Sequence, residues 1–64
     1  MNELNCVKLV FVDAAGIHTS FHRIDDSNGA TTIAIALREN GAATAYGVYK
    51  IIDGEVETLM TWNA

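Results

Sequence analysis

Apolar and polar residues alternate over much of this chain, and short glycine-containing breakers separate the alternating segments. The breakers are residues 13–16, 25–29, 40–41 and 53–54. Each joins Gly to Asp or Asn, residues that tolerate positive φ better than most. Segments of roughly eight to twelve residues lie between the breakers. This spacing predicts several short strands.

The Asp53-Gly54 pair predicts a β-hairpin. An Asp-Gly pair between apolar runs is typical of a two-residue type I′ corner. The resulting register sets residues of the two strands opposite each other: Ile52 with Glu55, Ile51 with Val56, and Lys50 with Glu57. Continued alternation predicts one shared face made of Tyr49, Ile51, Val56, Thr58, Met60 and Trp62.

Two strands are predicted before residue 25. Residues 6–12 are rich in β-branched and aromatic residues, which favour strands. Alternation gives each strand two faces. In the first, Val7, Leu9 and Phe11 oppose Lys8, Val10 and Val12. In the second, residues 17–24, the faces are Ile17, Thr19 and Phe21 against His18, Ser20 and His22.

Residues 30–41 fit either a strand or a helix. As a strand, Ile33, Ile35 and Leu37 share a face, and Asn40-Gly41 forms a hairpin corner. As a helix, the segment forms an apolar stripe, with Ser27 or Asn28 as the cap at its start and Gly41 just after its end. The stripe would contain Ala30, Ile33, Ala34, Leu37 and Gly41. The β-branched Thr31, Thr32, Ile33 and Ile35 lose rotamer freedom in a helix, which favours the strand.

We therefore predict a single all-β domain over residues 1–64, a small five-stranded antiparallel meander. Its strands span roughly 4–12, 17–24, 31–39, 42–52 and 55–62. Ile33 then pairs with Val48 and Ile35 with Tyr46, while Tyr49 or Trp62 covers Gly47. Because strands three and four are apolar on both faces, the sheet either curls like a barrel or meets a partner. The alternative is an α+β fold, ββαββ, with a helix at about 28–40 packed on an antiparallel sheet.

Charge narrows the range of partners. The formal net charge is −4, from eight acids and four bases. The bases Lys8, Arg23, Arg38 and Lys50 are scattered, which argues against direct binding of nucleic acid. Opposite electrostatic fields favour a protein partner with a basic surface, although such acidity also serves solubility alone.

The expected location is the cytoplasm. Cys6 is the single cysteine, so the sequence contains no possible intrachain disulfide and suits a reducing compartment. No run approaches the roughly 20 apolar residues of a membrane span. The first residues lack a basic region followed by an apolar stretch, so no signal peptide is expected.

No residue pattern predicts catalysis, a metal or a cofactor. His18 and His22 are four residues apart, which on a strand separates them by roughly 13 Å, too far to chelate one ion. Cys6 lies near His22 and Arg23 in the expected register, but a lone Cys in an apolar strand is usually a small core residue. Ser20 and Ser27 lack the setting of a catalytic nucleophile.

The candidate partner-binding residues are acidic or aromatic: Asp25, Asp26, Asp53, Glu55, Glu57, Tyr46, Tyr49 and Trp62. Ordered carboxylates can imitate phosphates, and Tyr and Trp provide large contact areas. We therefore predict a non-enzymatic protein that binds and inhibits or modulates a larger protein, one with a basic or nucleic-acid-binding surface. Contact would involve acidic loops, a sheet edge or the spare apolar face.

The type of protein is similar to phage-encoded inhibitors of host defence, such as anti-CRISPR proteins. This analogy rests on small size, acidity and missing site chemistry, and no motif carries it. The alternative is a structural subunit that assembles as a homodimer or larger homo-oligomer through its apolar face and edge strands.

Overall fold

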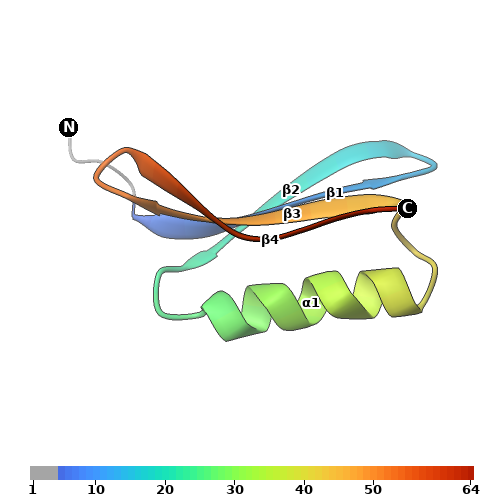
Figure 1. The fold of residues 1–64 in the computed structure, drawn as a ribbon, viewed down its shortest axis with the longest axis horizontal. Coiled ribbons are helices and arrows are strands. Elements are labelled where there is room, and N and C mark those ends of the chain that lie inside the picture. Colours follow the sequence, from blue (N-terminus) through green and yellow to red (C-terminus); the bar gives the residue numbers. More distant parts are fainter. Residues whose placement is uncertain (1–4) are drawn as a thin grey trace.

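Four antiparallel strands and one helix form two layers in the computed structural model, which describes residues 5–64 (Figure 1). The strands are β1 (Cys6–Asp13), β2 (Gly16–Arg23), β3 (Ala45–Ile52) and β4 (Glu55–Asn63). Their order in the sheet is β2-β1-β3-β4, and every neighbouring pair is antiparallel. Helix α1 (Ser27–Glu39) connects β2 to β3 and lies across one face of the sheet.

The predicted antiparallel sheet is present, but the predicted five-stranded all-β meander is wrong. The sheet has four strands and does not close into a barrel, and the segment expected as the third strand lies in α1. The expected pairs of Ile33 with Val48 and Ile35 with Tyr46 do not form, because β3 pairs with β1 and β4. The α+β alternative, with its helix at about 28–40, describes the structure better.

Two β-branched residues of α1 are threonines whose hydroxyls bond to the preceding turn. The Thr31 hydroxyl donates hydrogen bonds to the carbonyl oxygens of Ser27 and Asn28 at 3.0 and 3.1 Å. The Thr32 hydroxyl donates to the Asn28 carbonyl at 2.7 Å. Bonds to the preceding turn give a helical Thr favourable rotamers that Val and Ile lack. Branching at Cβ was therefore a poor guide to the secondary structure of these two residues.

Asn40-Gly41 ends the helix. The Gly41 N–H donates to the Arg38 carbonyl at 3.1 Å, and the Ala42 N–H donates to the Leu37 carbonyl at 2.8 Å. These two bonds define a Schellman motif, in which the residue after the cap adopts positive φ. Gly41 has φ +67°, whereas Asn40 has φ −87°. A type I′ hairpin corner would need positive φ at both residues.

The core lies between α1 and one face of the sheet. Ala30 and Ala34 are fully buried on the helix, and their small side chains let the helix backbone approach the strands. Val7, Leu9 and Val48 are the large side chains that are fully buried beneath them. Burial of each contributes about 1.5–3 kcal/mol to folding. Partly buried side chains surround this centre: Phe11, Ile24, Leu59, Met60 and Trp62.

The Asp53-Gly54 hairpin forms as predicted. Ile52 lies opposite Glu55, Ile51 opposite Val56 and Lys50 opposite Glu57. Asp53 and Gly54 have φ +52° and +80°, the backbone of a type I′ corner. The Asn5 side-chain oxygen accepts a hydrogen bond from the Asp53 N–H at 2.9 Å. The start of the described chain is therefore attached to this corner.

A β-bulge changes which residues of β4 face the helix. Val48 lies opposite Met60 but Tyr49 lies opposite Thr58, so Leu59 is an extra residue in β4. The bulge shifts the alternation by one position. Met60 and Trp62 therefore pack in the core. Simple alternation had predicted that they share a face with Val56 and Thr58, and this prediction is wrong.

Substitution of Gly41 should distinguish the helix cap from a hairpin corner. We expect Gly41→Ala to lower the free energy of unfolding by about 1–2 kcal/mol, because a Cβ is unfavourable at positive φ. Asn40→Ala should change it by less than about 0.5 kcal/mol, because Asn40 has ordinary φ. Urea unfolding followed by circular dichroism measures both. A comparable loss in the two variants would indicate a type I′ corner and contradict the cap.

Candidate interaction surface

The face of the sheet opposite α1, here called the open face, carries exposed apolar side chains. Strand register places on it, among others, Lys8, Val10 and Val12 from β1, Ile17, Thr19, Phe21 and Arg23 from β2, Tyr49 and Ile51 from β3, and Val56 and Thr58 from β4. The exposed fractions of Ile17, Phe21 and Val56 are 74%, 61% and 62%. Their alternation with core residues places them there, because adjacent strand residues point to opposite faces.

A shallow groove crosses the open face. Its volume is about 370 Å³, and it is lined by Lys8, Val10, Tyr49, Ile51 and Val56. The Tyr49 side chain lies over Gly47, where a Cβ would collide with the phenol. Of the two residues expected to cover Gly47, Tyr49 does so. An aromatic ring held against backbone presents its area at little entropic cost.

Charge on the open face is the reverse of the charge of the whole chain. Lys8 and Arg23 are basic, and no acidic residue lies among the strand positions that form this face. Lys8 is half-buried, so its hydrocarbon stem adds to the apolar surface while its ammonium group can reach solvent. A partner on this face would meet apolar area together with positive charge.

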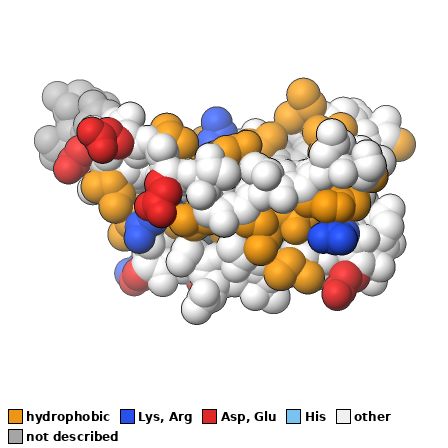
Figure 2. Space-filling view, in the orientation of Figure 1, with side chains coloured by type: hydrophobic (Ala, Val, Ile, Leu, Met, Phe, Trp, Pro, Cys, Tyr) orange, Lys and Arg blue, Asp and Glu red, His pale blue; other side chains and the backbone are white. Residues whose placement is uncertain are grey.

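The five predicted acidic residues gather at one end of the molecule, here called the acidic end. They are Asp25 and Asp26 in the β2–α1 connection, Asp53 at the β3–β4 corner, and Glu55 and Glu57 in β4. Because Cys6 lies opposite both Arg23 and Ile51, the connection and the corner are at the same end of the sheet. Figure 2 shows carboxylates over the turn of the β3–β4 hairpin.

Two of these carboxylates contact nearby residues of their own chain. Asp25 Oδ1 lies 3.4 Å from Arg23 Nε, and both side chains are largely exposed. Such an exposed ion pair adds little stability. The Asp26 carboxylate lies against Gly29 in the first turn of α1, so closely that a Cβ there would collide with it. Negative charge at this place is favourable because it faces the positive end of the helix dipole.

The remaining acids line a second depression, of about 420 Å³, formed by Lys50, Ile52, Asp53, Glu55, Val56 and Glu57. Lys50 and Glu57 are cross-strand neighbours as predicted, but they do not form an ion pair within 4.0 Å. Their charges therefore stay available to solvent or to a partner.

Tyr46 and Trp62 belong to the core side of the sheet. Their ring centroids are 5.6 Å apart, and the Arg38 guanidinium lies 4.9 Å from the Trp62 ring. Tyr46 is buried, whereas Trp62 is partly exposed beside α1. A partner-binding role for these two residues stays a prediction. Of the three aromatic candidates, Tyr49 alone lies on the open face.

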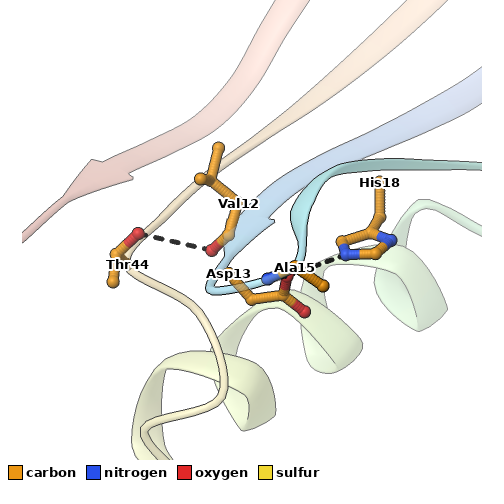
Figure 3. Close-up of polar contacts among 5 residues, drawn as sticks. All are labelled: Val12, Asp13, Ala15, His18 and Thr44. Carbon is orange, nitrogen blue, oxygen red and sulfur yellow. Dashed lines mark hydrogen bonds and ion pairs between the residues drawn. The ribbon is translucent and has the colours of Figure 1, made fainter.

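Strand β2 also holds two histidines with separate partners. Figure 3 shows the first of them, His18, beside Asp13. His18 Nε2 and Asp13 Oδ1 lie 2.8 Å apart, and the His18 ring stacks on Phe11 with centroids at 4.9 Å. The Ala15 N–H donates to the same Asp13 oxygen at 2.8 Å, which stabilises the β1–β2 turn. Across the sheet, Thr44 donates from its hydroxyl to the Val12 carbonyl at 3.4 Å.

The second histidine, His22, shares a 3.0 Å hydrogen bond with the Ser20 hydroxyl. A Ser–His contact resembles a nucleophile and its base, but catalysis also needs a third group that orients the base. Among the hydrogen bonds of residues 5–64, none joins His22 to a carboxylate. The pair instead satisfies two neighbouring polar side chains on the helix-facing side of β2.

Within residues 5–64 no group of three or more His, Cys, Asp or Glu side chains is arranged to bind a metal ion. Cys6 is a free thiol and is buried. Helix α1, the helix of the described part of the chain, lacks the length and apolar character needed to cross a membrane.

Comparison with protein-family models, curated proteins and solved structures finds no match to this chain. The surfaces described above are therefore the basis for a proposed function.

Substitution of His18 should raise the pKa of Asp13. The hydrogen bond from His18 lowers that pKa below its ordinary value of 3.8, and the backbone N–H groups of Ala15 and Gly16 contribute in the same direction. In His18→Phe we expect the Asp13 pKa to move towards 3.8, as measured by carboxyl carbon NMR shifts during a pH titration. The aromatic ring preserves stacking on Phe11.

The control is His22→Phe, which should leave the Asp13 pKa unchanged because His22 bonds Ser20 instead. A carboxyl whose pKa is lowered by folding stabilises the protein above its unfolded pKa, near pH 4, and this stabilisation disappears as pH falls through the folded pKa. An identical Asp13 titration in the wild type and His18→Phe would contradict the hydrogen bond.

Proposed function

We propose that this protein is a non-enzymatic interaction protein that binds a larger protein through the open face. One observation carries the proposal: Ile17, Phe21 and Val56 are each more than 60% exposed on a sheet face that no second layer formed by residues 5–64 covers (Figure 1). A contiguous patch of exposed apolar side chains marks an interaction site, whereas single scattered apolar side chains on a surface do not.

The chemistry of the open face indicates the kind of partner surface. Apolar area around Tyr49 and Phe21 fits an apolar patch, and Lys8 and Arg23 fit carboxylates at the rim of that patch. Complementary charges of this kind set register and exclude wrong partners more than they add affinity. The partner of the open face is therefore an apolar protein surface with an acidic border.

Inhibition follows if the covered surface is one that the larger protein uses. Such a protein needs no reaction centre, because it acts by occupying the partner's surface. This mode of action is that of the small anti-defence inhibitors to which the sequence suggested an analogy. We place the protein in a reducing, cytoplasmic setting, which suits the free thiol of Cys6.

A matched pair of variants tests the open face. Phe21 is on that face, whereas Ile35 is an exposed apolar residue of α1, with 39% exposure. Tagged wild-type protein, Phe21→Lys and Ile35→Lys are each used to capture partners from an extract of the source organism. The captured protein is then purified, and its affinity for each variant is measured by calorimetry.

We expect Phe21→Lys to lower the affinity at least about tenfold, because a central aromatic contact is replaced by a charge, while Ile35→Lys leaves it unchanged. Thermal unfolding should show that both variants remain folded, because both sites are exposed. If Ile35→Lys weakens binding as much as Phe21→Lys does, the open face is not the binding surface.

A second candidate function rests on the clustering of Asp25, Asp26, Asp53, Glu55 and Glu57 at the acidic end. Ordered carboxylates there could occupy the basic, nucleic-acid-binding groove of a partner by imitating phosphates. Such binding would weaken steeply with salt, because it depends on the same electrostatics as binding to nucleic acid.

Charge reversal separates this candidate from the open face. Glu57→Lys should reduce partner affinity strongly at low salt and less at high salt, whereas Glu39→Lys, at the far end of α1, should have little effect. The measurement is a binding titration with the captured partner at two ionic strengths. Equal affinity of Glu57→Lys and wild type at both would rule out phosphate imitation.

A further inference from the structure

Within residues 5–64, the outer edge of β2 carries backbone groups that the strand register leaves unpaired, apart from the Arg23 carbonyl, which accepts the Asp26 N–H at 2.9 Å. The Val12 carbonyl accepts the Thr44 N–H at 2.8 Å, so this residue of β1 bonds towards the β3 side. Bonding direction alternates along a strand, so the even-numbered residues of β1 bond towards β3 and the odd-numbered ones towards β2. In β2 the even-numbered residues therefore pair with β1. Ile17, Thr19, Phe21 and Arg23 direct their N–H groups to solvent.

The two edge strands of the sheet are protected to different degrees. β4 contains the bulge at Leu59 and the acids Glu55 and Glu57, devices that prevent an edge from pairing with another chain. β2 is eight residues long, pairs with β1 without a register shift, and contains neither proline nor an acid. It is the edge at which a further strand can be added.

We propose that two copies of this chain associate by antiparallel pairing of β2 with β2 about a two-fold axis. An antiparallel edge is self-complementary, because each copy offers the same alternating donors and acceptors. Pairing centred on Ser20 uses all four outward residues. Ile17 then lies opposite Arg23 of the second copy, and Thr19 lies opposite Phe21.

The distribution of charged residues favours association of two copies through β2 over association through β4. Two copies of a chain with net charge −4 repel each other wherever their acids meet. β2 brings no acid to the contact, and the Arg23 stem would cover Ile17. Pairing through β4 would bring Glu55 and Glu57 of both copies into the contact, which is unfavourable for two chains that already repel each other.

The dimer would enlarge the surface available for binding. A two-fold axis perpendicular to the sheet keeps both helices on the same side, so the two four-stranded sheets join into one of eight strands. Ile17 and Phe21 of both copies would then lie at the middle of one continuous open face. The association does not depend on the proposed function, because it needs no other partner.

Matched proline substitutions test the edge. Thr19 is exposed on the outer edge of β2, and Thr61 is exposed on the outer edge of β4, where its position opposite Gly47 also turns its N–H outward. Proline is tolerated where a strand N–H faces solvent but prevents that edge from pairing. Sedimentation equilibrium over a series of concentrations gives the dimer dissociation constant of the wild type, Thr19→Pro and Thr61→Pro.

We expect a concentration-dependent dimer in the wild type, a dissociation constant raised at least about tenfold in Thr19→Pro, and no change in Thr61→Pro. Weakening by Thr61→Pro alone would assign the contact to β4, and an unchanged dimer in both variants would assign it to the open face. Either result overturns the proposal, as does a wild type that stays monomeric up to millimolar concentration.

Amide hydrogen exchange of the wild-type protein tests the β2–β2 pairing even if Thr19→Pro does not fold. The N–H groups of Ile17, Thr19 and Phe21 should exchange more slowly as protein concentration rises, because pairing protects them. The Thr61 N–H should show no such dependence. Fast, concentration-independent exchange at all three β2 positions would contradict pairing at this edge.

Discussion

One-sided burial is the constraint on which this structure depends. The chain forms one helix within its described residues, and that helix covers one face of the sheet. Because Ala30 and Ala34 are small, α1 packs closely over Leu9 and the other buried side chains of that face. Strand alternation sends an equal set of residues to the opposite side. The apolar members of that set, such as Phe21, remain exposed, so the feature that stabilises the fold also creates its binding surface.

How much of the fold the sequence could predict depended on how local each signal was. The Asp53-Gly54 corner was predicted with its register, because both residues need positive φ and few other structures use that pair. Asn40-Gly41 was ambiguous, because Gly at positive φ serves a hairpin corner and a helix end alike. The decision lay in the preceding segment, where the hydroxyl of Thr31 bonds to the previous turn, a contact that requires the helix to exist first.

The candidate site was harder to predict, because it depends on alternation over long distances. A single extra residue, Leu59, moves Trp62 from the expected face to the core side, and nothing in the alternating sequence of β4 marks the bulge. Clustering of Asp25 with Asp53 at one end follows from antiparallel pairing of β1 with both β2 and β3. The predicted meander would also have placed these two acids at one end, because its second and fourth strands run in the same direction.

Separation of charge in the structure changes what the net charge of −4 implies. At physiological ionic strength, exposed charges act over about 8 Å, so a partner docked on the open face responds mainly to Lys8 and to Arg23, whose charge is partly offset by Asp25 Oδ1 at 3.4 Å. The other members of the acidic end, Asp26, Asp53, Glu55 and Glu57, influence the approach of a partner more than its final contacts. Net charge alone suggested a basic partner, whereas the local charges favour an acidic border around an apolar patch. The two statements are compatible, because the first concerns encounter and the second concerns the bound state.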